Sequence, residues 1–179
     1  MKAYKNAAQD LKIQYGVRTY EQIEKMFDLE DGETPHLHFL LSLLGLKSDT
    51  KIDIDKKDLK SDDKREFSLR TMYQKNQTDF DTYFGLITIL DNIDEDFNYV
   101  VNTVAFERTE MHDKKFLKME NVKTFYEYML AGIDAFKHEF FSYGHNPVDV
   151  ADSIHDFLTI DQEETEDLIE QFKLEELEE

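Results

Sequence analysis

A chain of 179 residues is long enough to fold as one domain with a substantial hydrophobic core, and its formal charge of −19 opposes direct nucleic-acid binding, because such a field repels phosphates. The chain has no cysteine, which excludes disulfides, zinc–thiolate sites and thiol nucleophiles, and its two prolines and six glycines are too few for a loop-rich or all-β chain. We therefore predict a mainly α, single-domain helical bundle.

The N-terminal part of the chain predicts two helices. Apolar residues at helical spacing indicate a first helix over residues 5–15, which would end at Gly16. Thr19 and Gln22 have the spacing of a capping box for a second helix over residues 20–27.

The most apolar predicted helix covers residues 34–45, and we expect the other elements to pack against it. Thr34 can cap its first amide groups, and Pro35 suits a first helical position because that position leaves an N–H unpaired. Gly45 is expected to close the helix in the left-handed conformation. Four leucines share one side and should be buried: Leu37, Leu40, Leu41 and Leu44.

A charged connection over residues 56–64 separates two stretches that alternate between apolar and polar residues. These stretches, 51–54 and 67–72, predict a small two-stranded β ribbon that rests on the helices.

Four further helices are predicted in the second half of the chain. The first covers residues 80–90, begins at Thr78 or Asp79, and should turn Tyr83, Phe84, Ile87 and Leu90 inward. The others are 97–105, 121–143 and 148–158. For residues 97–105 the apolar period, which includes Phe97, favours a helix capped by Asp94, although the β-branched residues there favour a strand. Gly132 predicts a close packing contact or a bend, and residues 112–118 resemble a connector.

Residues 161–179 form an acidic C-terminal helix or tail beyond the helical domain of residues 1–160. The segment holds ten acidic residues and one basic residue, and a narrow apolar stripe runs along it. A stripe with acidic neighbours is typical of a segment that binds a groove or a basic surface, and the alternative is a solvated last helix. The predicted interaction residues of this segment are Asp167, Leu168, Ile169, Glu170 and Phe172.

Metal-dependent chemistry has few candidate ligands. The dipeptides His112-Asp113 and His155-Asp156 match the pair that HD-type phosphohydrolases use, but such a site needs further His and Asp ligands from neighbouring helices. Glu33-x-x-His36 matches half of a carboxylate di-metal motif, yet it straddles the helix start. Glu107 and Glu110, one turn apart around Arg108, indicate an exposed face with local ion pairs. We predict no metal, no cofactor and no catalytic residue.

Other ligand-binding patterns are also weak. The six glycines are isolated from one another, so no phosphate-cradling loop is present, and no serine has the glycine context of a nucleophile elbow. The most basic stretch contains Lys64, Arg65, Arg70 and Lys75. Arg70 is our candidate for a phosphate or partner contact, and pairing with the chain's own carboxylates is the alternative.

Three segments together suggest a family. Residues 39–47, Phe-Leu-Leu-Ser-Leu-Leu-Gly-Leu-Lys, precede a polar connection and then residues 67–73, Phe-Ser-Leu-Arg-Thr-Met-Tyr. An apolar helix follows over residues 83–90, and residues 126–136 contain Ala-Gly-Ile. This order resembles the small proteins encoded beside bacterial phosphorothioate DNA-modification and restriction systems, although their later helix carries two glycines where this chain has one. The resemblance implies an accessory role in anti-phage defence and carries no catalytic residue.

The sequence therefore predicts a cytoplasmic, non-enzymatic accessory or interaction protein whose partner is a basic protein surface, such as that of a DNA-modifying or DNA-binding protein. One alternative is an acidic DNA mimic that occupies the nucleic-acid site of its partner. The other is a metal-dependent hydrolase. No apolar run approaches the roughly 20 residues of a membrane span, and the N-terminus lacks the apolar core of a signal peptide. The sequence indicates no particular oligomeric state.

Overall fold

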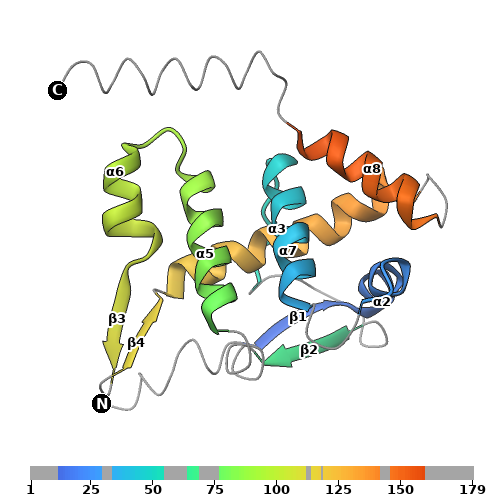
Figure 1. Ribbon diagram of the computed structural model, residues 1–179. Coiled ribbons are helices and arrows are strands. Elements are labelled where there is room, and N and C mark those ends of the chain that lie inside the picture. Colours follow the sequence, from blue (N-terminus) through green and yellow to red (C-terminus); the bar gives the residue numbers. More distant parts are fainter. Residues whose placement is uncertain are drawn as a thin grey trace.

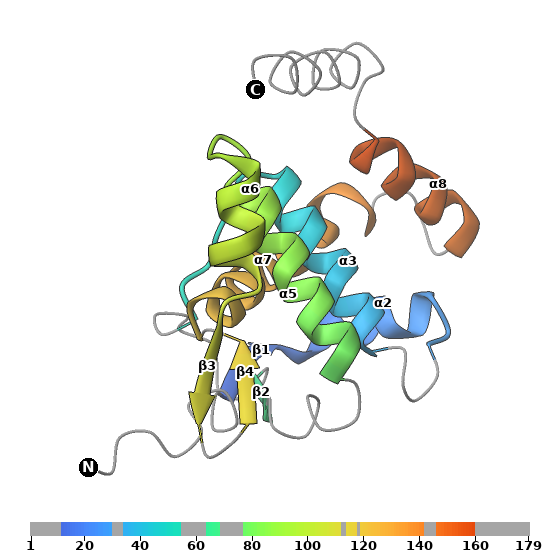
Figure 2. The same ribbon diagram turned by 60° about the vertical axis from the view of Figure 1, so that its left-hand side comes forward.

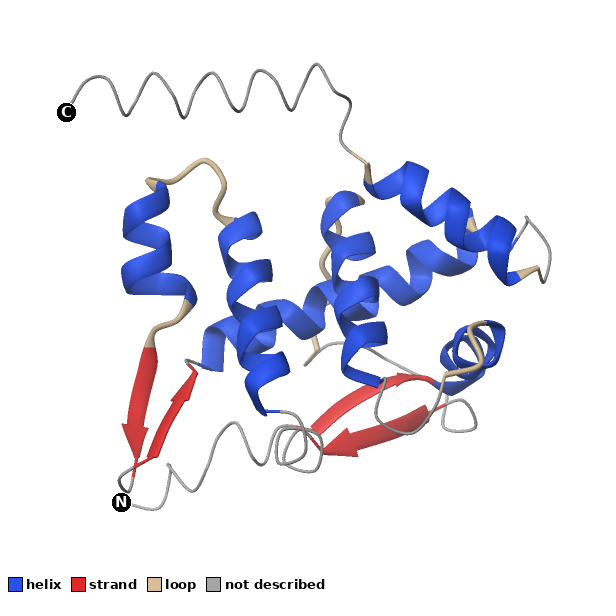
Figure 3. Ribbon diagram, viewed as in Figure 1, coloured by secondary structure: helices blue, strands red, loops and turns tan. Residues whose placement is uncertain are grey.

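A computed structural model describes residues 12–29, 34–54, 64–68, 77–111, 114–117, 119–141 and 146–159. These residues are mainly helical, which confirms the predicted fold class (Figure 1, Figure 3). The helices are α2 (Val17–Met26), α3 (Thr34–Lys47), α5 (Gln77–Asp91), α6 (Phe97–Tyr99), the π-helical segment η2 (Val100–Ala105), α7 (Met119–Glu139) and α8 (Pro147–Leu158). The strands are β1 (Lys12–Gly16), β2 (Lys64–Ser68), β3 (Arg108–Met111) and β4 (Lys114–Leu117).

The core lies where α3 and α5 cross the long helix α7. Figure 1 shows α3 and α5 side by side across α7, and Figure 2 shows the same arrangement from a second direction. Helix α3 is central, as its apolar composition predicts. Fully buried large side chains come from α2, α3, α5 and α7: Ile23, Leu41, Leu44, Phe80, Phe84, Ile87, Phe125, Tyr126, Met129 and Phe136.

Two glycines allow α3 and α7 to approach closely. A Cβ atom on Gly132 would lie 2.6 Å from the carbonyl carbon of Leu41 and closer still to its oxygen. A Cβ atom on Gly45 would lie 2.8 Å from the carbonyl carbon of Tyr128, again with the oxygen closer. The prediction of a close contact at Gly132 is confirmed. The prediction that Gly45 closes its helix is wrong, because Gly45 is buried inside α3 against the backbone of α7.

Aspartates, and not glycines, adopt the left-handed conformation after the first two helices. Asp49 has φ 48° just beyond α3, and the amide of Thr50 donates to the carbonyl of Gly45. Asp28 has φ 49° just beyond α2, where the amide of Leu29 donates to the carbonyl of Glu24. Asp tolerates this conformation better than most side chains, so either helix can end without a glycine.

The β structure differs from the prediction. Strand β1 pairs antiparallel with β2, in register Lys12↔Ser68 to Gly16↔Lys64. The predicted helix over residues 5–15 is therefore wrong for residues 12–15, and residues 5–11 lie outside the described part. Residues 51–54 form no strand; the amide of Ile52 instead donates to the carbonyl of Glu127, 3.1 Å away. Of the predicted strand 67–72, residues 67 and 68 belong to β2.

The described part of the predicted connector 112–118, residues 114–117, is a strand of a second ribbon. Strands β3 and β4 pair antiparallel, in register Arg108↔Leu117 to Met111↔Lys114. Glu107 precedes β3 and Glu110 lies within it, so they are not neighbours on a helical turn as predicted. Arg108 pairs with Asp81 of α5, at 2.8 Å between Nη2 and Oδ2.

The helices of the second half match the predicted ranges to within a few residues. The helix expected over residues 97–105 is present, and its second part is the π-helical η2. Its N-cap is Asp96 rather than Asp94. Thr19 and Thr78 lie inside the first turns of α2 and α5, so neither is an N-cap. None of the described helices combines the length and the apolar character that crossing a membrane requires.

Candidate functional site

The predicted interaction residues lie outside the part of the chain that the structure describes. Asp167, Leu168, Ile169, Glu170 and Phe172 lie outside the described residues, as does the whole segment 161–179. Arg70 also lies outside them. Of its basic neighbours, Lys64 and Arg65 belong to β2.

The described histidines and carboxylates do not gather into a metal site. His155 Nδ1 and Asp156 Oδ1 are 3.6 Å apart on α8, and both side chains are largely exposed. Within the described ranges, no group of three or more His, Asp or Glu side chains is arranged to hold a metal ion. The other dipeptide, His112-Asp113, and Glu33 lie outside these ranges.

The two histidines of α3 face opposite environments. His36 is exposed, and its Nδ1 atom lies 2.6 Å from the hydroxyl oxygen of Tyr83. The ring of Tyr83 stacks on that of Phe39, with the ring centroids 4.3 Å apart. His38 is buried, with Nε2 2.9 Å from the hydroxyl of Tyr20. Burial lowers the pKa of His38 to about 3, so this imidazole is neutral near pH 7. Because solvent does not reach it, His38 is a core residue that joins α2 to α3.

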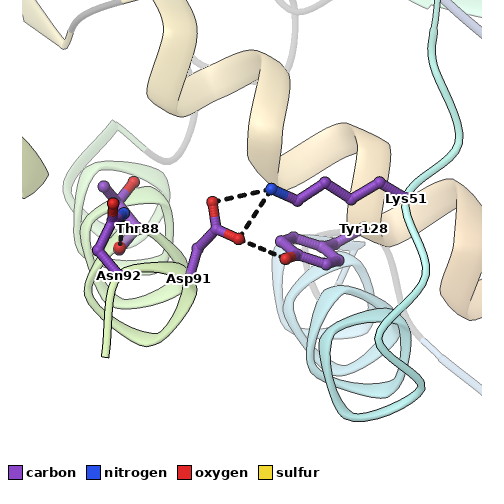
Figure 4. A network of polar contacts seen from close by, with 5 residues as sticks. All are labelled: Lys51, Thr88, Asp91, Asn92 and Tyr128. Atoms are coloured by element: carbon purple, nitrogen blue, oxygen red, sulfur yellow. Dashed lines mark hydrogen bonds and ion pairs between the residues drawn. The ribbon is translucent and has the colours of Figure 1, made fainter. Parts of the chain in front are cut away.

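A polar network joins the segment after α3 to α5 and α7 (Figure 4). Lys51 Nζ lies 2.8 Å from Asp91 Oδ1 and 2.9 Å from Oδ2, and it also lies 4.7 Å from the ring centroid of Tyr128. The hydroxyl of Tyr128 donates to Asp91. Burial, together with this hydrogen bond, raises the pKa of Tyr128, so the phenol stays protonated. The network contains no free base or nucleophile, and it connects three elements.

A groove with a volume of about 400 Å³ lies between α2, the end of α7 and the start of α8. The described residues that line it are Gln22, Lys25, Met26, Phe141 and Pro147. They include one cation and no pair of groups suited to acid–base chemistry.

Among the described residues, exposed apolar side chains gather at the turn between α5 and α6. We call it the α5–α6 face and define it by the apolar residues Leu86, Leu90, Ile93, Phe97 and Tyr99 and the acidic residues Asp94, Glu95 and Asp96. Ile93 is 59% exposed, Phe97 50% and Tyr99 56%. Figure 1 shows this turn at one end of the described fold, and α8 at the other.

One sequence prediction placed a member of this face, Leu90, in the core, and it is wrong. Leu90 is 39% exposed and Phe97 is half exposed, although both continue an apolar helical period. The reason is that Phe84 and Ile87 already fill the side of α5 that faces α3 and α7. The available signal was local: Ile93 and Phe97 flank three consecutive acidic residues, a pattern that a buried turn would not carry.

Comparisons of this chain with protein-family models, with curated proteins and with solved structures found no match.

Proposed function

We propose that this chain is a non-enzymatic accessory protein that acts through protein–protein contacts. The α5–α6 face is the observation that carries the proposal. Single exposed apolar residues are ordinary on protein surfaces, but several within one turn and its flanking helices mark a surface that a partner covers. Among the described residues, six of the seven large apolar side chains that are exposed fall in the stretch from Leu86 to Phe106.

The polar groups of the described core support a binding role over a chemical one. His38 and Tyr128 are kept in their neutral forms by burial, and Asp91 is held by Lys51 and Tyr128. Each of these groups takes part in a contact that joins two elements of the fold. The proposed setting, bacterial DNA modification or anti-phage defence, rests on the sequence resemblance of residues 39–47 and 67–73.

An acidic DNA mimic is the alternative, and one observation favours it. Asp149, Asp152 and Asp156 are exposed on α8 at spacings of three and four residues, so they form a row along one side of the helix. A mimic needs one continuous acidic face, whereas this row and the acidic turn at Asp94–Asp96 lie at opposite ends of the described fold (Figure 1). The interaction proposal therefore has the stronger support.

The test is affinity purification of the tagged full-length protein from its host at moderate salt, with retained proteins identified by mass spectrometry. The double variant Ile93→Ser/Phe97→Ser removes apolar surface from the α5–α6 face. Val148→Ser is the matched control, because Val148 is 64% exposed on α8. We expect one partner to be retained by the wild type and by Val148→Ser and lost from the double variant. Retention of the same DNA-binding protein by all three forms, with release at high salt, would instead favour the mimic.

A further inference from the structure

The charge pattern of the α5–α6 face restricts what can cover it. Between Leu86 and Phe106 the chain contains no Lys, Arg or His, and it contains four carboxylates. Asp91 is paired with Lys51, and Asp96 accepts a hydrogen bond from the amide of Tyr99. In the described part of the chain, Asp94 and Glu95 make no side-chain hydrogen bond or ion pair, and both are exposed. The face therefore offers two unneutralised carboxylates beside exposed apolar side chains.

The apolar side chains of the face come from the last turns of α5 and from the chain just beyond it. Leu86 and Leu90 are four residues apart, which places them on one side of α5, and Ile93 lies in the turn two residues after the end of this helix. Phe97 and Tyr99 follow across the turn, and Figure 2 shows α6 beside α5. An exposed apolar surface of this kind can receive the apolar side of a partner helix.

Three kinds of occupant conflict with this chemistry. DNA or RNA would bring phosphates against Asp94 and Glu95, and an anionic membrane would bring its headgroups against the same carboxylates. In a symmetric dimer the second copy would contribute the same patch, which adds two further carboxylates and no cation to pair with them. Each arrangement leaves like charges together at an interface that excludes water.

We propose that the α5–α6 face binds a basic amphipathic helix of the partner protein. The inference rests on the proposed interaction function and names the part of the partner that is recognised. The apolar side of the helix covers Leu90, Ile93 and Phe97, while its Lys and Arg side chains pair with Asp94 and Glu95. Apolar burial supplies most of the affinity, and the ion pairs select the orientation and exclude acidic competitors.

The test uses the full chain and a fluorescein-labelled Lys/Leu peptide of about 18 residues, or five helical turns, with its apolar residues on one side. A scrambled peptide of the same composition and a Glu/Leu peptide are the controls. Binding is measured by anisotropy at roughly 150 mM salt, where the Debye length is about 8 Å. We expect the ordered basic peptide to bind at least tenfold more tightly than either control.

Matched variants separate recognition from general attraction to an acidic protein. Asp94→Asn/Glu95→Gln removes two charges from the face, and Asp152→Asn/Asp156→Asn removes two charges from α8. We expect the first pair to weaken peptide binding about tenfold, because two ion pairs with the peptide are lost, and the second pair to change it less than twofold. Ile93→Ser/Phe97→Ser should weaken binding at least tenfold, and Val148→Ser should not.

Three outcomes would overturn the inference. Equal weakening by both charge pairs would show attraction without a site. Absence of peptide binding to the wild type, or equal binding of the scrambled peptide, would exclude recognition of a basic amphipathic helix. A concentration-dependent dimer in sedimentation that Ile93→Ser/Phe97→Ser abolishes would assign the face to self-association. If the purification experiment still retains a partner through the face, only the inference fails; if it does not, the proposed function fails as well.

Discussion

Replacing Gly132 by Ala should destabilise the fold, although Ala is the better helix former. Two effects oppose each other inside α7. The intrinsic preference of Ala over Gly in a helix interior stabilises by about 1 kcal/mol. Against this, the new Cβ would lie 2.6 Å from the carbonyl carbon of Leu41, which belongs to the backbone of α3 and cannot rotate away.

The steric effect is the larger one. Relieving the overlap requires α3 and α7 to separate, and a gap of about 0.5–1 Å forfeits a quarter to a half of the dispersion attraction across a contact. Overpacking of this kind costs about 1–3 kcal/mol, and the upper end applies because backbone meets backbone at the centre of the core. After the helix-propensity gain, we expect Gly132→Ala to lower the free energy of unfolding by about 2 kcal/mol. Gly45→Ala should behave similarly, because its Cβ would meet the backbone of Tyr128.

Gly85→Ala provides the matched control. Gly85 is also buried inside a helix, but its Cβ would meet the ring of Phe106, with Cδ1 at 2.7 Å. Phe106 is an exposed side chain, so its ring can move into solvent at little cost. Here the helix preference should dominate, and the variant should be as stable as the wild type or up to about 1 kcal/mol more stable.

The assay is urea unfolding followed by circular dichroism, with tyrosine fluorescence as a second probe because the chain contains no Trp. Unchanged m-values would justify reading midpoint shifts as stability changes. If Gly132→Ala and Gly45→Ala were as stable as Gly85→Ala, the close approach of α3 and α7 would be refuted.

Three further perturbations test other parts of the core. The pKa of His38 is about 3 in the folded protein and about 6.5 in the unfolded chain, so the unfolded chain binds a proton first as the pH falls. The contribution of the neutral His38 to stability is therefore complete above pH 6.5 and decreases below it. At pH 5 the free energy of unfolding should be lower by about 2 kcal/mol, which urea unfolding at several pH values should detect. In His38→Gln that part of the pH dependence should disappear, and an unchanged profile would contradict the buried neutral imidazole. Tyr128→Phe should lower the free energy of unfolding by about 1 kcal/mol, because the hydrogen bond to Asp91 is lost. Thermal unfolding at the same temperature as the wild type would contradict this hydrogen bond. Asp49→Val should cost about 1–2 kcal/mol, because a β-branched residue resists a positive φ, whereas Thr50→Val, at an exposed neighbour, should cost little.

The helical elements were predictable because their signals are local. Pro35 and a run of leucines predict helix α3. Asn146 before Pro147 predicts the start of α8, and the side chain of Asn146 accepts a hydrogen bond from the amide of Val148. Such signals depend on residues within one or two turns of one another, so the sequence contains them completely. The strands were misjudged for the opposite reason. Strand β1 pairs with β2, some fifty residues later, and no local pattern at residues 12–16 specifies that partner.

The candidate site shows the same division between local and long-range information. The acidic tail was the natural candidate from sequence because charge and apolar spacing are both visible there, and that prediction stays untested. The α5–α6 face could not be recognised from periodicity, since Leu90 and Phe97 have the same spacing as residues that are buried. Whether an apolar residue at helical spacing is covered depends on how many neighbours compete for the same side of the core.

The sequence alone determined that this chain is helical and acidic and that α3 is its most apolar element, because composition and helical periodicity act over short distances. Only the tertiary structure decided what Gly45 and Gly132 do and which apolar residues remain outside. Within a helix, glycine is less favourable than alanine, and it becomes necessary only where a second backbone approaches so closely that a Cβ atom would not fit. The crossing of α3 and α7 gives both glycines their role. Phe84 and Ile87 fill the side of α5 that faces these two helices, and Leu90 remains exposed.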